Sequence, residues 1–322
     1  MTRYSLRKNV DLFGVWMKRP IFMVYAAMLV LFALFAVVIP GYGSLNNVMN
    51  IIRLSAFLGI VAGGQTLVIV SGGIDLSVGA IVSFADVLVA QLAVLHADAT
   101  TAIIVTLAAG MLMGLVNGMA IVWLKISPLI MTFALGFVID GIALIITAGS
   151  PAGNVPQVLT TLGSGSFGIV PIILIPWALY GILISLIMHR TTFGRYLYAM
   201  GQSRSVARMA GVPHQFVTIG VYVLSGLSAT FAGMLLAGFS GVAYLGIGTP
   251  YTLESVAGVV IGGASILGGT GNYLGTIAGT LIFTMIQGGM TVLNIPQAGR
   301  YLVEGAVIIL LLLAYGRARK IV

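Results

Sequence analysis

The chain has 322 residues, of which 59% are hydrophobic and only 7% are charged, whereas about 25% of the residues in a soluble domain are charged. This composition predicts a polytopic membrane protein. Lys and Arg total 15 against 7 Asp and Glu, an excess that membrane orientation explains without nucleic-acid binding. The absence of cysteine excludes disulfides and thiolate chemistry, and three scattered histidines predict no metal cluster.

Ten segments are long and apolar enough to be candidate membrane spans, since a span needs about 20 mostly apolar residues. In chain order they are 20–39, 51–70, 78–95, 100–124, 128–148, 170–188, 216–238, 252–268, 273–293 and 300–315, the eighth being the shortest. The first run is longer than the roughly 7–15-residue core of a signal peptide and no small-residue cleavage site follows it, so we expect an uncleaved span. The 43 glycines favour closely packed and broken helices, as in transporters.

The charge distribution predicts the orientation of the chain. With a cytoplasmic N-terminus, ten spans return the C-terminus to the cytoplasm. Thirteen of the 15 basic residues then lie inside, namely Arg3, Arg7, Lys8, Lys18, Arg19, Lys125, Arg190, Arg195, Arg204, Arg208, Arg317, Arg319 and Lys320, and only Arg53 and Arg300 lie at outside ends. Because basic residues concentrate in cytoplasmic loops, this count favours ten spans with both termini inside.

A glycine pair interrupts the apolar pattern between the second and third spans, in the sequence SGGIDLSVG (71–79). Asp75 could cap the following helix from within this break. One interpretation is a cytoplasmic turn. The other is a broken helix close to a transport path, because backbone groups freed inside a bilayer need protein or water as partners.

The most strongly charged interior segment is 189–213, HRTTFGRYLYAMGQSRSVARMAGVP. Its second half predicts a short helix with Ser203 as N-cap, Gly211 in the left-handed conformation after the helix, and Pro213 as a stop. The predicted apolar side carries Val206, Ala207, Met209 and Ala210, and the other side carries Arg204 and Arg208. Because so short a helix is unstable alone in water, it must pack on the membrane domain, on anionic lipid or on a partner protein.

Several polar residues fall within the predicted spans and are candidates for a translocation path. An Asp at a helix centre costs roughly 2.5–3.5 kcal/mol on insertion, so such residues usually face the bundle interior, where they line a path or brace helices. The neutral amides suit an uncharged polyol, because amides both donate and accept hydrogen bonds. The candidates are Gln65, Asp75, Asp86, Asn117, Asp140, Glu254 and Gln287, and Glu304 is a further intramembrane carboxylate.

The sequence contains no recognisable catalytic triad, paired catalytic carboxylates, metal-ligand spacing or G-x-x-x-x-G-K-[ST] phosphate loop. We therefore predict no catalytic residue, no metal site and no nucleotide site in this chain. The glycine-rich run 262–272 resembles a phosphate loop only in its glycine content, and a tight turn between helices explains it.

Four stretches together resemble the membrane subunits of bacterial ribose-type sugar ABC importers. They are 68–84 (VIVSGGIDLSVGAIVSF), 125–149, 190–212 and 251–282, and the similarity extends over about 20–315. The resemblance implies an all-α ABC importer permease fold of about ten transmembrane helices, some broken or short and glycine-rich. Residues 1–322 would form one transmembrane permease domain in the bacterial inner membrane, with 189–213 as its cytoplasmic coupling loop.

The resemblance also implies partners and site residues. The permease would work as a dimer with cytoplasmic ATPase subunits, which bind ATP and Mg²⁺, and with a periplasmic sugar-binding protein; the chain itself would bind no cofactor. The ATPase-coupling residues would be Gly194, Arg195, Ala199, Gly201, Arg204, Ala207, Arg208 and Gly211. Gln202 to Arg204 depart from the pattern of many relatives and leave open the cognate ATPase and whether the second permease is identical or paralogous. Residues 268–272 also depart, and we expect a tolerated turn variant there.

The resulting prediction is import of a monosaccharide of the ribose, galactose or galactofuranose type. Alternatives are an ABC permease for a non-sugar solute such as a nucleoside or signalling molecule, a proton-coupled transporter that uses Asp86, Asp140 or Glu304, and a channel-like or scaffold subunit. The long basic loop and the absence of a His/Asp relay spacing argue against the proton-coupled transporter.

Overall fold

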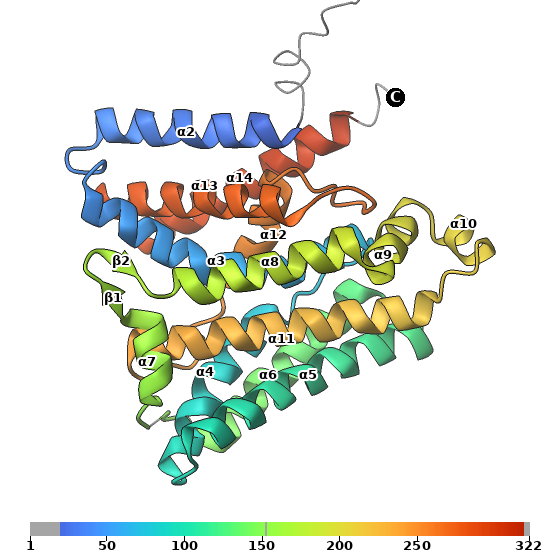
Figure 1. Cartoon of the computed structure of the whole chain (residues 1–322), viewed down its shortest axis with the longest axis horizontal. Helices are drawn as coiled ribbons and strands as arrows, with labels where there is room; N and C mark the ends of the chain where they lie inside the picture. The colour runs from blue at the N-terminus through green and yellow to red at the C-terminus, as the bar shows by residue number, and fades with distance from the viewer. Residues whose placement is uncertain (1–19, 152, 319–322) are drawn as a thin grey trace, which may run out of the picture.

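The computed structural model describes residues 20–151 and 153–318, and these form a mostly helical protein (Figure 1). The predicted N-terminal basic residues Arg3 to Arg19 lie outside the described residues, as do Arg319 and Lys320. The long helices are α2 (Pro20–Val38), α3 (Leu45–Val70), α4 (Val78–Val94), α5 (Ala99–Trp123), α6 (Pro128–Thr147), α8 (Leu174–Arg190), α11 (His214–Ser240), α13 (Tyr273–Val292) and α14 (Gln297–Ala318). Shorter elements are helices α7 (Gln157–Ser164), α9 (Thr192–Gln202), α10 (Arg204–Met209) and α12 (Tyr251–Ile261), and the antiparallel strands β1 (Ser166–Phe167) and β2 (Val170–Pro171).

By length and composition, six of the described helices can cross a bilayer, or seven if the bent pair α8–α9 is one span. The six are α2, α3, α5, α6, α11 and α13, while α4 and α12 are apolar but shorter, with 17 and 11 residues. The protein is therefore a polytopic membrane protein, as predicted, while the number ten remains a prediction.

Each predicted span coincides with a helix, but three boundaries were wrong by four residues or more. Helix α3 begins at Leu45 rather than 51, because Ser44 caps it through a hydrogen bond from Asn47 N to Ser44 Oγ. Helix α8 begins at Leu174 rather than 170, because β1 and β2 occupy the preceding residues. Helix α12 ends at Ile261 rather than 268, because the glycine-rich run 262–272 turns the chain back toward α13, with Gly263, Gly268, Gly269 and Gly271 at positive φ.

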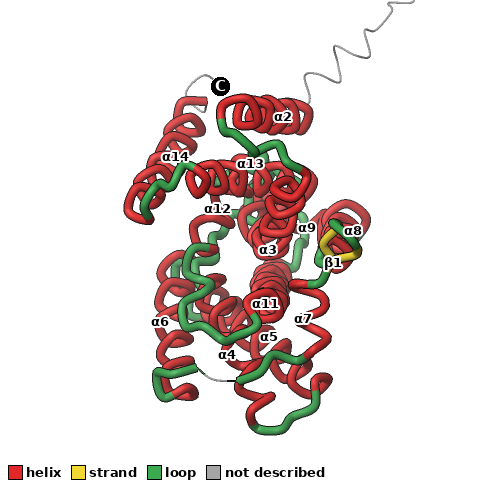
Figure 2. The backbone as a smooth tube through the Cα atoms, turned by 90° about the vertical axis from the view of Figure 1, so that its left-hand side faces the viewer, coloured by secondary structure: helices red, strands yellow, loops and turns green. Residues whose placement is uncertain are grey.

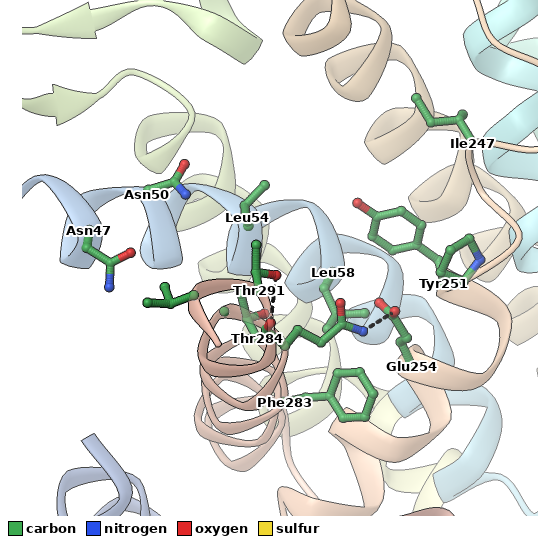
Figure 3. Close-up of a pocket in the computed structure, with 14 residues that line it drawn as sticks. Asn47, Asn50, Leu54, Leu58, Ile247, Tyr251, Glu254, Phe283, Thr284 and Thr291 are labelled. Carbon is green, nitrogen blue, oxygen red and sulfur yellow. Dashed lines mark hydrogen bonds between the residues drawn. The ribbon is translucent and has the colours of Figure 1, made fainter. Parts of the chain in front are cut away.

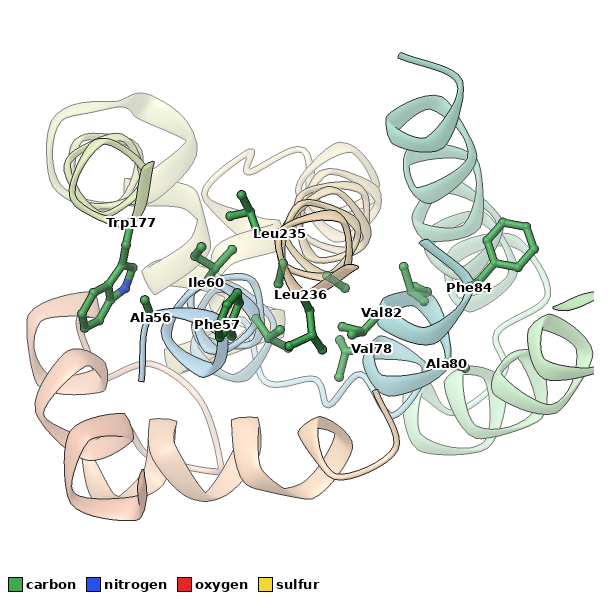
Figure 4. Packing of buried hydrophobic residues seen from close by; sticks show 14 of the residues in the cluster. Ala56, Phe57, Ile60, Val78, Ala80, Val82, Phe84, Trp177, Leu235 and Leu236 are labelled. Atoms are coloured by element: carbon green, nitrogen blue, oxygen red, sulfur yellow. The ribbon is translucent and has the colours of Figure 1, made fainter. Parts of the chain in front are cut away.

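Helix α11 lies at the centre of the bundle and packs against α3, α4, α5 and α7 (Figure 2). The largest hydrophobic cluster joins α3, α4 and α11 through buried side chains such as Phe57, Ile60, Val82 and Leu235 (Figure 4). Glycine permits the close crossing of α5 and α11, since a Cβ on Gly114 would lie 2.8 Å from Val223 Cα. The composition therefore acts through packing, as small residues do in membrane bundles.

The short helices α4 and α12 begin next to each other inside the bundle. A Cβ on Gly79, in the first turn of α4, would lie 2.7 Å from the Gly248 carbonyl oxygen just before α12. Hydrogen bonds hold the segment that leads into α12 against α4: Gly248 N donates to Ser83 Oγ at 2.9 Å, and Tyr244 N donates to Asp86 Oδ2 at 2.7 Å. Two helix N-termini, each with a partial positive charge, thus meet in the interior.

Candidate coupling surface and translocation site

The segment 189–213 starts with a sharp bend between α8 and α9. The two helix axes differ by 69°, and Thr191 caps α9 by accepting a hydrogen bond from Gly194 N at 3.1 Å. A Cβ on Gly194 would lie 2.6 Å from the Met188 carbonyl carbon. The bend therefore requires glycine at 194, where the backbone lies against the end of α8.

The second half of the segment is the predicted short helix, α10. Ser203 is its N-cap and accepts a hydrogen bond from Val206 N, and Gly211 follows the helix with φ +77°. The boundaries are thus confirmed. The first half, however, is also helical, as α9.

The apolar side of α10 is mostly uncovered. Ala207 is buried, with 3% of its surface exposed, but Val206 is 58% and Met209 81% exposed. Arg204 and Arg208 are exposed beside them and line a hollow of about 490 Å³ with Met200. The surface of α10 therefore combines exposed apolar side chains with two guanidinium groups, which suits a protein partner.

Gly201, near the end of α9, lies at a three-way junction of backbone segments. A Cβ there would lie 2.8 Å from Gly269 Cα and closer still to Val70 O and Gly269 N. Gly269 N donates to Val70 O at 2.9 Å, and Gln202 Nε2 donates to Gly269 O at 3.0 Å. Tyr198 adds a 2.7 Å hydrogen bond to Gly271 O. The segment 189–213 thus touches both the residues that end α3 and the loop that follows α12.

The two departures from the family pattern, at Gln202 to Arg204 and at 268–272, meet at this junction, because Gln202 donates a hydrogen bond to Gly269. The other residues predicted to couple to an ATPase lie around the junction. On α9, Arg195 is exposed and Ala199 is half-buried. Gln202 is also exposed, so one side of it remains free for a partner.

Asp75 lies in the break between α3 and α4 and is fully buried. Its Oδ1 accepts from Ser77 N at 3.0 Å and from Ser77 Oγ at 2.6 Å, and its Oδ2 accepts from Ser225 Oγ on α11 at 2.8 Å. Asn117 Nδ2 on α5 donates to Ser77 Oγ at 2.9 Å. The break is therefore a buried interior segment rather than an exposed turn, and Asp75 holds α11 to the start of α4. Since Asp75 binds Ser77, the N-cap residue, it orders the start of α4 without binding the first-turn amides itself.

Glu254 and Gln287 line the same cavity of about 350 Å³, and Figure 3 shows Glu254 among the side chains around it. Gln287 Nε2, on α13, donates hydrogen bonds to Glu254 Oε1 on α12 and to Glu304 Oε1 on α14. The cavity is also lined by Asn47 and Asn50 on α3 and by Tyr251. Amide, carboxylate and hydroxyl groups above an apolar floor of Leu54, Leu58 and Phe283 fit a small polyhydroxylated solute.

The other path candidates are not in this cavity. Gln65 is fully buried on α3, and neither atom of its amide has a partner. Asp86 is fully buried and anchors Tyr244, with its Oδ1 unpaired. Asp140 is exposed on the outer face of α6. Of the seven candidates, the structure therefore brings Glu254 and Gln287 into one cavity and Asp75 and Asn117 into one buried network.

Sequence reasoning missed Asn47 and Asn50 because the second span was predicted to begin at 51. Their spacing of three residues directly after a Ser N-cap would have placed them on one face of an earlier first turn. It also missed Ser225, whose hydroxyl gives no sequence signal of its own, since serine is common in membrane helices. Within the described residues, no group of three or more His, Asp or Glu is arranged to hold a metal ion.

Comparison with known proteins gives consistent matches over most of the chain. A family profile described as branched-chain amino acid transport system / permease component matches residues 47–312. The ribose import permease protein RbsC of Escherichia coli (strain K12) is 32% identical over 292 residues, covering 89% of this chain and 91% of that protein. RbsC of Bacillus subtilis (strain 168) is 32% identical over 309 residues, 95% of each chain.

A third relative carries a different substrate name. The autoinducer 2 import system permease protein LsrD of Salmonella paratyphi B is 31% identical over 258 residues, 78% of each chain. No solved structure gives a significant match. The relatives thus agree on the class of protein and differ in the solute they are named for.

Proposed function

The chain belongs to the transport-system permease family whose profile it matches, within the ribose-type ABC permeases, and from this premise we propose that it is the membrane subunit of an ATP-driven importer that translocates a monosaccharide. In this proposal the chain catalyses no bond chemistry and binds no cofactor. A separate cytoplasmic ATPase binds ATP and Mg²⁺, a second permease completes the path, and a periplasmic binding protein delivers the sugar.

The observation that carries the proposal is the surface of α10. Exposed apolar groups on a short helix are costly in water, and Met209 with 81% of its surface exposed calls for a covering partner. Arg204 and Arg208 next to it add charge that suits a groove with acidic residues. A soluble ATPase bound here would lie on the side of the folded protein that carries the predicted cytoplasmic charges.

Energy from the ATPase would enter the membrane domain through Gly201. Gly201 packs backbone to backbone against Val70 and Gly269, a contact that cannot yield by rotating a side chain, and the side chains of Gln202 and Tyr198 add hydrogen bonds to the carbonyl oxygens of Gly269 and Gly271. A displacement of α9 would therefore be passed to the segments that border α4 and α12. The chain would supply different stabilities to its inward- and outward-open states, and ATP binding and hydrolysis would shift their populations.

The polar cavity at Glu254 and Gln287 is our candidate for a solute position on the path. Its donors and acceptors would exchange hydrogen bonds with sugar hydroxyls, and the adjacent apolar surface would face the ring carbons. Asp75, Asn117 and Asp86 act in this proposal as braces, since each is already engaged with neighbouring segments.

A non-sugar signalling solute is the second candidate substrate, because LsrD is named for autoinducer 2 import and is 31% identical to this chain. The two candidates require the same permease mechanism. Calorimetric screening of the cognate binding protein against monosaccharides and against autoinducer 2 would distinguish them by which ligand binds.

The proposal is tested by reconstituting the permease with its ATPase and binding protein in proteoliposomes. We expect solute uptake that needs ATP and the ATPase and that a proton uncoupler leaves unchanged. Met209→Asp should abolish ATPase association and uptake, because it places a charge in the docking surface, whereas the exposed Ser205→Ala on the same helix should behave as wild type. Uptake without any ATPase present, or full coupling in Met209→Asp, would contradict the proposal.

A further inference from the structure

A groove of about 690 Å³ runs along the outer side of α8, away from the polar cavity and from α10. It is lined by one face of the helix, with residues recurring every three or four positions from Leu174 to Arg190, and by Leu274 and Ile277 of α13. Sixteen steps of about 1.5 Å make this face roughly 24 Å long. A groove of this length extends over more than half of a hydrocarbon core about 30 Å thick.

Small residues form the floor of the groove. Ala178, Gly181 and Ser185 lie at helical spacing on the face of α8 that lines it. At Gly181 a Cβ would already lie 3.0 Å from the ring of Tyr273 beneath it. Large apolar side chains, Ile182 and Leu186, form the rim on one side and are exposed. The shape is a narrow apolar trough, suited to an acyl chain.

One end of the trough is cationic. His189 and Arg190 line it, and both are exposed. His189 Nδ1 lies 3.0 Å from Ser185 O, which leaves Nε2 free to face a ligand. No carboxylate lines the groove. A basic pocket at the end of an apolar groove between membrane helices is the arrangement that binds an anionic lipid headgroup.

We propose that this groove is a binding site for an anionic phospholipid, with one acyl chain along Ala178 and Gly181 and the headgroup phosphate at Arg190 and His189. The ligand is a lipid of the leaflet on the side of α9 and α10, which the charge distribution predicts to be cytoplasmic. A helix of another protein fits less well, because its backbone would have to enter a trough that ends in two exposed basic side chains.

The position of this site gives the lipid an influence on α9. Arg190 is the last residue of α8, and the chain turns by 69° directly after it. A headgroup held at Arg190 would therefore fix the bend from which the coupling segment projects. This consequence depends on the proposed coupling function, whereas lipid binding itself does not.

The test is lipid retention by the full-length permease purified in mild detergent, with vesicle-derived phosphatidylglycerol and phosphatidylcholine supplied in equal amounts and bound lipid measured by native mass spectrometry. We expect wild type to retain phosphatidylglycerol selectively. Arg190→Gln should lower that retention about fivefold, while Arg208→Gln, an equally basic and exposed position outside the groove, should leave it unchanged. Ala178→Leu, at an exposed groove position that avoids Tyr273, should lower retention of both lipids by filling the trough.

Equal loss in Arg190→Gln and Arg208→Gln would mean that general surface charge attracts the lipid, and would overturn the site. Unchanged retention in Ala178→Leu would overturn the acyl-chain placement, as would co-purification of a protein on the groove in place of lipid. The assay uses no ATPase, nucleotide or sugar, so its failure is distinguishable from failure of the proposed transport function.

Discussion

The substitution Gly201→Ala tests the junction that joins the coupling segment to the membrane domain. In an unobstructed helix this change would stabilise the chain by about 0.5–1 kcal/mol, because glycine loses more backbone entropy on folding than alanine. Here the new Cβ would lie 2.8 Å from Gly269 Cα, whereas carbon atoms in contact are about 3.5–4.0 Å apart. Helix α9 must therefore move outward by at least roughly 0.7–1.2 Å, because the Cβ would lie closer still to Val70 O and Gly269 N.

The cost of this movement has two parts. Overpacking costs about 1–3 kcal/mol, and weakening the hydrogen bond from Gly269 N to Val70 O adds about 0.5–1.5 kcal/mol. Together they exceed the entropic gain, so the expected net effect is destabilisation by about 0.5–4 kcal/mol. The test therefore depends on whether Gly201→Ala stabilises or destabilises the protein, and not on the size of the change.

Thermal inactivation of the purified permease, followed by size-exclusion chromatography, measures the stability, and the ratio of solute transported to ATP hydrolysed measures coupling. We expect Gly201→Ala to lower both the midpoint temperature and the ratio. Gly141→Ala is the matched control, since Gly141 lies within α6 and a Cβ added there would have no neighbouring atom within 4 Å, so this substitution should be neutral or slightly stabilising. If the Gly201→Ala protein is as stable and as tightly coupled as wild type, then the close backbone packing at Gly201 is not required for stability or coupling, and the reasoning is wrong.

Three further predictions concern the interior and the partner surface. Asp75→Ala should destabilise the protein by about 2–5 kcal/mol, because it leaves the Ser77 and Ser225 donors buried without an acceptor, while Asp75→Asn keeps an acceptor and should cost less; equal thermal midpoints for the two would contradict this. Gln287→Leu should reduce uptake per folded permease and also lower the thermal midpoint, because the cavity loses an amide and the Glu254 and Glu304 carboxylates lose its hydrogen bonds; unchanged solute uptake would remove the cavity from the path. Met209→Asp should abolish co-purification of the ATPase without changing the thermal midpoint, because the side chain is exposed, and a lowered midpoint would mean that α10 packs on the membrane domain instead.

Local features of the chain were predicted well from the sequence. The ends of α4, α5 and α13 fall within a residue of the predicted spans, and Ser203 and Gly211 bound α10 as expected. These signals depend only on nearby residues. An apolar run of about 20 residues indicates a helix in lipid, and a Ser side chain caps the amides that follow it. A glycine can adopt positive φ after a helix whatever surrounds that helix. The family resemblance rested on such motifs too.

The sequence left open the surroundings of residues that contact segments far away in the chain. Gly201 is a coupling residue by the family resemblance, and the structure adds that it lies against Val70 and Gly269, which are far from it and from each other along the chain. The apolar side of α10 was predicted from its residues, and the structure adds that only Ala207 of that side is buried. No periodicity within 189–213 carries that information.

What the sequence by itself determined is the class of protein, its membrane character and most helix boundaries, since each depends on composition or on neighbours within a few residues. Only the tertiary structure decided which polar residues meet. Glu254 and Gln287 line a shared cavity, Asp75 pairs with Ser225 across 150 positions, and Asp140 is left on an outer face. The physical reason is that a polar group inside the membrane needs a hydrogen-bonding partner or a polar cavity. Which partner it meets depends on how the helices cross. Glycines far away in the chain help to set those crossings, because they let helices approach closely.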